Sequence, residues 1–182
     1  MQGTDYRPGV EYNDGMAAKL FIPEEEFLRM TFDGPELEYK DGEVIERAMP
    51  TNLHSKAQQG LAVFFDLAGR KQPLFGRPEL RMKLREGRYV TSDYAVFAGA
   101  EPTDEWPENP PRIVIEVLSP DDRMSEVRDK LEEYLEWGAP HIWLIDPRKR
   151  IFFSFTAKGL AEVPTLDAPE LGITMRPDDI LH

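Results

Sequence analysis

A strand–helix–strand unit in the second half of the chain constrains the fold more than any other segment. It opens with the nearly continuous aliphatic run Ile113-Val114-Ile115-Glu116-Val117-Leu118, which is typical of a strand covered on both faces. Ser119 to Asp122 then predicts the start of a helix over about 122–137, which Gly138 is expected to end. A second apolar strand follows from His141 to Ile145. Strands joined in this way pair in parallel through a right-handed crossover, which places the chain in the α/β class.

The other segments extend this unit into a mixed sheet flanked by helices. The further expected elements are a helix over 23–30, a hairpin of strands 36–40 and 43–46, a helix over 53–69, and strands over 74–84, 88–97 and 151–156. Asp41-Gly42 between two strand-like runs is a tight-turn signal, and Asn52 is expected to cap the longer helix. We expect residues 1–22 to form an N-terminal arm and residues 23–182 to form one domain whose C-terminal segment is loop-like.

The composition excludes several classes of protein. The 182-residue chain contains no cysteine, which excludes disulfides and zinc–thiolate sites. No apolar run approaches the ~20 residues that span a bilayer, and the first residues lack the basic start and apolar stretch of a signal peptide. We therefore expect a cytoplasmic protein with no membrane partner. Glycine-rich phosphate loops, the His-Glu-x-x-His motif and nucleophile elbows are also absent from the sequence.

The net charge of −12 bears on the partners of the protein. Proteins that hold nucleic acid usually place Lys and Arg near the phosphates, and this electrostatic attraction dominates non-specific affinity. An acidic chain can still contain a local basic groove. The charge therefore predicts weak, salt-sensitive and metal-dependent binding to nucleic acid.

Two acidic residues stand within expected apolar strands. Glu116 interrupts the aliphatic run, and Asp93 lies near the middle of the strand over 88–97, where aspartate is disfavoured. Burying an ionised carboxylate without a partner is costly, and a bound cation removes that cost. If the two strands are neighbours, both carboxylates could converge on Mg²⁺ or Mn²⁺, which prefer oxygen ligands. Alternatively, Glu116 is half-exposed and paired with an arginine at a strand end, and Asp93 lies at a bulge or in an edge strand.

Lys130 is the third candidate for a chemical role. On the helix over 122–137 it lies beside the buried stripe rather than at the centre of the solvent-facing side. Its ammonium could therefore reach the strand that carries Glu116. The alternative is a surface ion pair with Glu126 or Glu133 on the same helix, which would contribute little to stability.

His54 and one basic cluster complete the candidates. His54 lies near the start of the helix over 53–69, where backbone N–H groups favour anions and a histidine can orient a ligand. A surface or capping histidine is the alternative. The basic cluster either meets phosphates near the site or forms a solvated strand face; its members are Arg81, Lys83, Arg85 and Arg88.

Taken together, these segments resemble the Uma2 family of endonucleases within the PD-(D/E)XK superfamily. The resemblance covers residues from about 23 to 165. Its motifs are Glu38-Tyr39-Lys40-Asp41-Gly42-Glu43, His54, Ser92-Asp93-Tyr94-Ala95-Val96-Phe97, Ile115-Glu116-Val117-Leu118-Ser119-Pro120, Asp129-Lys130 with Tyr134 and Gly138, and Trp143-Leu144-Ile145-Asp146-Pro147. The resemblance implies a restriction endonuclease-like core.

The resemblance also implies roles for particular residues. It assigns Asp93 and Glu116 to metal binding, with the carbonyl of Val117 as a third ligand. Lys130 would be the catalytic lysine. The polar site would be completed by Glu43 and His54.

The chain departs from the pattern of the resemblance at two positions. Leu118 stands two residues after the acid, where the superfamily carries its lysine, so Lys130 on the following helix must replace it. Ser92 stands where the family usually has proline, and proline sets backbone shape without supplying a functional group.

The expected function is metal-dependent hydrolysis of phosphodiester bonds in nucleic acid, with DNA as the expected substrate. Mg²⁺ or Mn²⁺ would polarise the scissile phosphate and lower the pKa of a bound water. One alternative is a catalytically silent protein that uses the same fold as a binding module, and another is a phosphodiesterase that acts on a non-DNA substrate. By analogy with nucleases that pair to cut two strands, a homodimer is expected.

Overall fold

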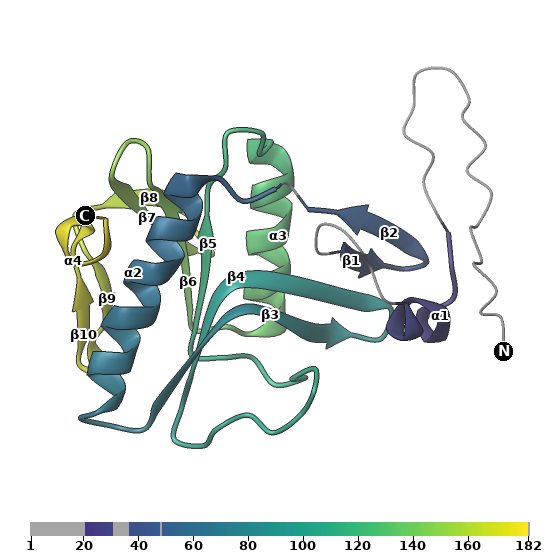
Figure 1. Ribbon diagram of the computed structural model, residues 1–182, viewed down its shortest axis with the longest axis horizontal. Coiled ribbons are helices and arrows are strands. Elements are labelled where there is room, and N and C mark those ends of the chain that lie inside the picture. Colours follow the sequence, from purple (N-terminus) through teal and green to yellow (C-terminus); the bar gives the residue numbers. More distant parts are fainter. Residues whose placement is uncertain (1–20, 31–36, 48, 182) are drawn as a thin grey trace, which may run out of the picture.

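The computed structural model describes residues 21–30, 37–47 and 49–181. Its elements, labelled in Figure 1, are α1 (Glu24–Arg29), β1 (Leu37–Lys40), β2 (Glu43–Glu46), α2 (Asn52–Gly69), β3 (Leu74–Arg85), β4 (Arg88–Ala98), β5 (Ile113–Val117), α3 (Met124–Trp137), β6 (His141–Asp146), β7 (Ile151–Thr156), β8 (Gly159–Val163), β9 (Leu166–Ala168), the 3-10 helix η1 (Pro169–Leu171), β10 (Ile173–Met175) and α4 (Pro177–Ile180). Of the expected arm, residues 1–20 lie outside the described residues. Within the described ranges, no helix is both long enough and apolar enough to cross a membrane.

Eight strands form one mixed sheet. Seven follow the order β2-β1-β4-β5-β6-β7-β8, and β3 pairs with β4 outside this order. β5 and β6 are parallel, in register from the pair Ile113–His141 to the pair Val117–Ile145, whereas β5 and β4 are antiparallel. This arrangement confirms the expected parallel strand–helix–strand unit. β4 is an interior strand, because β3 occupies one of its edges and β1 and β5 share the other.

The two faces of the sheet are covered by different helices (Figure 1). Alternate residues of a strand point to opposite faces. Ile113 and Ile115 of β5 accordingly pack in one core with Leu61 and other residues of α2. Val114 packs in a second core with Leu131 of α3. Burial on both faces explains why β5 reads as a continuous aliphatic run.

The β1–β2 hairpin lies next to the start of β4. Asp41 and Gly42 form its turn with positive φ angles of 50° and 97°, as expected for the Asp-Gly signal. β1 pairs with β4 through Tyr39–Tyr89 and Lys40–Arg88. The hairpin therefore brings residues from early in the sequence beside the first half of β4, the strand that carries Asp93.

The starts of the two long helices differ from the expectation. Thr51, not Asn52, is the N-cap of α2, and the Thr51 hydroxyl accepts a hydrogen bond from the His54 backbone N–H at 3.3 Å. α3 begins at Met124, later than expected. The Asp122 carboxylate accepts from the Ser119 N–H at 2.6 Å and so closes a turn before the helix instead of capping it.

The C-terminal segment is not loop-like, contrary to the expectation. It forms β8, β9, η1, β10 and α4. Apolar residues of β9 and β10 are buried in the core that contains α2; they are Leu166, Ala168, Ile173 and Met175. Strands of three residues are too short to show an alternating pattern in a sequence, which explains why they were not expected.

Candidate active site

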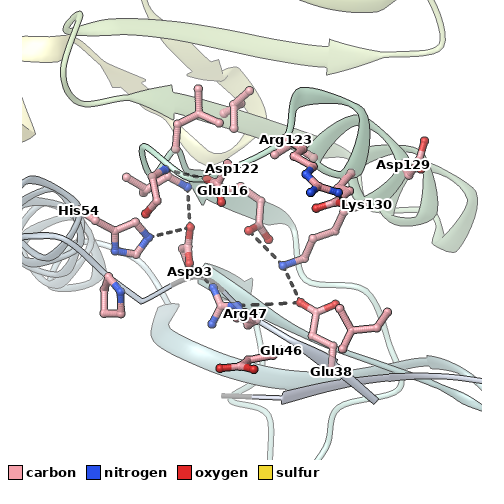
Figure 2. A pocket seen from close by; sticks show the side chains of 18 of the residues that line it. Glu38, Glu46, Arg47, His54, Asp93, Glu116, Asp122, Arg123, Asp129 and Lys130 are labelled. Carbon is pink, nitrogen blue, oxygen red and sulfur yellow. Dashed lines mark hydrogen bonds and ion pairs between the residues drawn. The ribbon is translucent and has the colours of Figure 1, made fainter. Parts of the chain in front are cut away.

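A cavity of about 890 Å³ opens between the hairpin, the start of α2 and the end of β5. Figure 2 shows side chains from these elements and from α3 around it. Among the described residues that line it, ten are Asp or Glu and five are Lys or Arg. Asp93, Glu116, Lys130, His54 and Glu43 all line this one cavity.

Asp93 lies on β4 with 2% of its surface exposed. Its Oδ2 accepts from the Val117 backbone N–H at 2.6 Å and lies 3.1 Å from His54 Nε2, while its Oδ1 accepts from Arg47 Nη2. Burial alone would raise the pKa of Asp93, but the His54 hydrogen bond and the Arg47 charge outweigh it and lower that pKa. Asp93 is thus a buried, ionised carboxylate in an interior strand, and the edge-strand alternative is wrong.

Glu116 lies on β5 with 8% of its surface exposed. Since Tyr94 pairs with Ile115, Asp93 and Glu116 are the next residues along two adjacent strands. Glu116 Oε1 accepts from the Tyr134 hydroxyl at 2.7 Å, and Oε2 lies 3.1 Å from Lys130 Nζ. Burial raises the pKa of Glu116 to about 7, the Asp93 charge adds to the increase, and the Lys130 charge only partly opposes it. The half-exposed, arginine-paired alternative for Glu116 is wrong.

The Lys130 ammonium extends from α3 between two carboxylates (Figure 2). Nζ lies 2.8 Å from Glu38 Oε1, 3.1 Å from Glu116 Oε2 and 2.8 Å from the Thr91 carbonyl oxygen. Three acceptors match the three donors of an ammonium, so its position is well determined. Burial lowers the pKa of Lys130, but Glu116 and Glu38 raise it further than burial lowers it. The charged form of Lys130 is favoured because two carboxylates lie beside the ammonium. The charged form of Glu116 is disfavoured because Glu116 also has the repelling charge of Asp93.

His54 is buried rather than on the surface, with 4% of its area exposed. Its backbone N–H bonds to the Thr51 hydroxyl at the start of α2, and its ring points at Asp93 (Figure 2). Its Nδ1 atom is buried and has no hydrogen-bond partner among the described residues. Glu43, on β2, is half-buried and lines the hairpin side of the cavity.

Glu38 and Arg47 are site residues that sequence reasoning missed. Glu38, 5% exposed on β1, contacts Lys130 and also lies 3.1 Å from Arg88 Nη2. A signal was present, since Glu38 lies beside Tyr39, an apolar anchor of the hairpin, and strand alternation places the two on opposite faces. Arg47 follows β2 outside any motif and carries no such signal.

The basic cluster does not line the cavity as a group; of its four members, only Arg88 does. Lys83 is paired with Glu108 and Arg85 with Asp41, while Arg81 lies over the ring of Phe27. Arg88 is buried between Glu38 and Glu133. The solvated-face alternative therefore describes Lys83 and Arg85 better than a phosphate groove does.

The donor atoms fit a divalent cation that is held only partly by protein. Asp93 and Glu116 occupy neighbouring positions on adjacent strands and line the same cavity, as does Val117, which follows Glu116 along β5. Among the described residues, no group of three or more His, Asp or Glu side chains is arranged to hold a metal ion. A cage made only of protein ligands is therefore not supported by these residues, whereas Mg²⁺ and Mn²⁺ sites commonly add waters and substrate phosphate to one or two carboxylates.

Comparison with known proteins adds the family to this geometry. No curated protein matches the chain. The fold is similar to that of "a putative nuclease belonging to DUF820" from Anabaena variabilis ATCC 29413, with a TM-score of 0.71, 23% identity, and coverage of 91% of this chain and 98% of that chain. This likeness confirms the expected mixed sheet with flanking helices and its nuclease-like fold. Residues 24–178 match the family model of Uma2, described as "Putative restriction endonuclease". The chain therefore belongs to the Uma2 family.

Proposed function

We propose that this protein is a metal-dependent endonuclease that hydrolyses phosphodiester bonds in nucleic acid. The observation that carries the proposal is the cluster of Asp93, Glu116 and Lys130. Two buried carboxylates on adjacent strands share a cavity with an ammonium 3.1 Å from one of them. Buried charges that are close together and open to a cavity are typical of catalytic sites. The description of the Uma2 family and the name of the Anabaena protein point to the same class of reaction.

Each residue has a distinct part in this proposal. The Asp93 and Glu116 carboxylates and the Val117 carbonyl would hold Mg²⁺ or Mn²⁺. When bound, such an ion polarises a phosphate and lowers the pKa of a coordinated water. Lys130, fixed by Glu38 and the Thr91 carbonyl, would neutralise negative charge that develops on the phosphate.

His54 and Glu43 have supporting parts. His54 donates to Asp93 and so orients that carboxylate towards the cavity. Glu43 faces the same space from the hairpin and would contact bound water or the hydrated ion. His54 is therefore a positioning residue that acts through Asp93, whereas Glu43 would act on the bound water or the hydrated ion.

The acidic lining supports metal dependence. Because the described residues around the cavity include ten acidic and five basic side chains, they present a net negative field to a phosphate. A divalent cation between Asp93 and Glu116 would offset that field where the phosphate must approach. Binding of nucleic acid should therefore be weak, salt-sensitive and dependent on the metal.

Plasmid cleavage in Mn²⁺ tests the proposal. Asp93→Asn and Glu116→Gln remove a charge but keep the size of the side chain, and each should lower the cleavage rate at least ~100-fold, in line with the loss of a group that stabilises the transition state. Asp129→Asn is the matched control, because Asp129 lines the same cavity but is exposed and points away from Asp93 and Glu116 (Figure 2). Undiminished cleavage by either site variant would overturn the assignment.

The acidic cavity also favours a second candidate, a phosphodiesterase that acts on a substrate other than duplex DNA. A small diester brings one or two phosphates into the negative field instead of a continuous charged backbone. Cleavage of a small bis-nucleotide ester in Mn²⁺ by a preparation that leaves plasmid intact would favour this candidate. A protein that binds Mn²⁺ but cleaves neither substrate would instead be a silent member with a binding role.

A further inference from the structure

Arg47 is placed where it contacts the site more directly than its sequence position suggests. It follows β2 at the end of the hairpin, and its side chain is only 17% exposed. Nη2 donates to Asp93 Oδ1, Nη1 donates to Glu79 Oε2 at 2.5 Å, and Nε lies 3.9 Å from Glu38 Oε1. The guanidinium therefore lies against a carboxylate that is proposed to bind a metal, and both groups line the cavity (Figure 2).

The other basic residues of the cavity have different attachments. Arg88 is held by Glu38 and Glu133, and Lys40 is paired with Glu133. Arg123 is exposed and paired with Glu126 on its own helix. None of these contacts involves Asp93 or Glu116.

Lys130 does contact Glu116, but it would keep two other acceptors if Glu116 bound a cation. Those acceptors are Glu38 and the Thr91 carbonyl. Arg47 differs, since Asp93 is one of its two close partners. A cation on Asp93 would therefore release one nitrogen of Arg47 and leave the other attached to Glu79.

The backbone of Glu79 adopts a conformation that residues other than glycine rarely adopt. It lies in β3 opposite Asp93 of β4, between the pairs Pro78–Tyr94 and Leu80–Ser92. Its φ angle is +47°, a left-handed conformation that is unfavourable for a residue other than glycine. Its two carboxylate oxygens accept from Arg47 and from Gln58 of α2. Backbone strain of this kind is concentrated at sites where a side chain must be held in one place.

We infer that Arg47 is the counter-ion of Asp93 until a divalent cation takes its place, and that the released guanidinium, tethered by Glu79, then binds a phosphate oxygen of the substrate. The inference rests on the proposed metal site and adds the residue that recognises the phosphate. A guanidinium suits this task because its planar donors match phosphate oxygens, and its charge is retained at every accessible pH. The same residue thus links cation binding to substrate binding in an otherwise acidic cavity.

Calorimetric titration of Mn²⁺ into the full chain tests the first half of the inference. Arg47→Gln removes a cation that competes for Asp93, so it should bind Mn²⁺ roughly tenfold more tightly than the wild type, a coupling of ordinary size between two binding events. Arg123→Gln is the matched control. It removes one positive charge from the rim of the same cavity without touching Asp93, and screening should limit its effect to about twofold. Equal affinity of wild type and Arg47→Gln would overturn the exchange.

Fluorescence anisotropy of a labelled DNA oligonucleotide tests the second half. The titration is done with and without Ca²⁺, a hard cation that takes the same oxygen ligands and serves as the probe. Wild-type protein should bind DNA more tightly with Ca²⁺, and Arg47→Gln should lose most of that gain even though it holds the cation better. A full cation-dependent gain in Arg47→Gln would exclude Arg47 as the phosphate ligand.

These outcomes separate the inference from the proposed function. If neither wild type nor Arg47→Gln binds Mn²⁺, the proposed metal site fails and the inference fails with it. If both bind Mn²⁺ equally, the metal site stands and the exchange alone is wrong. Arg47→Lys covers the case in which Arg47→Gln does not fold. A single ammonium cannot bridge Asp93 and Glu79 as two guanidinium nitrogens do, so its Mn²⁺ affinity should lie between those of wild type and Arg47→Gln.

Discussion

Asp93 in the middle of β4 and Glu116 near the end of β5 lie on adjacent strands and are both buried, but their pKa values are shifted in opposite directions. Asp93 receives donors from Val117, His54 and Arg47, and its pKa is lowered. Glu116 receives the Tyr134 hydroxyl and the Lys130 ammonium, and its pKa is raised to about 7. The difference arises because Arg47 and His54 both contact Asp93, whereas Glu116 shares Lys130 with Glu38. Two carboxylates of one site can thus differ in protonation near neutral pH.

The largest effect expected from this comparison concerns stability. Asp93→Asn should lower the free energy of unfolding at pH 8 by about 2 kcal/mol, because Arg47 and His54 lose an ionised partner inside the protein. Since the pKa of Asp93 is lowered from its ordinary value of 3.8, the wild-type advantage is present above that pH and is lost as the pH falls through the lower folded-state pKa. Urea unfolding of both proteins at pH 8 and at about pH 2, well below the ordinary pKa of an aspartate, measures this loss. A penalty that stays constant down to acid pH would contradict the assignment of an ionised Asp93.

The pH dependence of metal binding should be the next largest effect. Glu116 must lose its proton to bind a cation, so Mn²⁺ affinity should fall by up to about tenfold for each pH unit below its pKa of about 7. Calorimetry at pH 6, 7 and 8 tests this. Glu116→Gln should bind Mn²⁺ weakly and with little dependence on pH. An affinity that does not change between pH 6 and pH 8 in wild-type protein would contradict the raised pKa.

The smallest expected effect is a gain in stability of Glu116→Gln, opposite in sign to the loss expected for Asp93→Asn. Glu116→Gln should raise the free energy of unfolding at pH 8 by about 1 kcal/mol without added metal, because the amide resembles the protonated acid that burial favours. A pKa raised from 4.5 to about 7 means that wild-type stability falls as the pH rises between these two values, while the variant is unaffected. Thermal unfolding at pH 5 and pH 8 should therefore give similar curves at pH 5 and separate ones at pH 8. A variant less stable than wild type at pH 8 would show that the Lys130 attraction outweighs burial.

Much of the fold follows from local patterns in the sequence. The aliphatic run of β5, the Asp-Gly turn and the parallel β5–α3–β6 unit were all accessible because each depends on residues close together in the chain. β9 and β10 were not, since their burial depends on packing against the core that contains α2. The division into an arm over 1–22 and a domain over 23–182 stays a prediction.

The candidate site could be predicted in part. Acids inside apolar strands indicated Asp93 and Glu116, and the helical position of Lys130 permitted its reach to β5. Arg47 and Glu79 could not be found in this way, because their importance comes from contacts between a hairpin and two strands that are distant in sequence. Their residue types are ordinary for exposed turns, and only the folded chain brings Arg47 onto Asp93 and Glu79 onto Arg47.

The hydrogen bond from the Val117 N–H to the Asp93 carboxylate has a consequence for the architecture of the sheet. Backbone pairing between β4 and β5 ends at Tyr94–Ile115, whereas β5 continues to pair with β6 as far as Val117–Ile145. The Asp93 side chain accepts from the Val117 amide, which lies past the last paired residues of β4 and β5. The carboxylate therefore replaces a backbone partner at the point where these two strands stop pairing. The cavity opens at this division, so one carboxylate both ends the ladder and faces the space beyond it. Residue 93 therefore has two roles, as a hydrogen-bond acceptor for Val117 and as a negative charge in the cavity. Asp93→Asn separates them, because asparagine can still accept from Val117 but carries no charge.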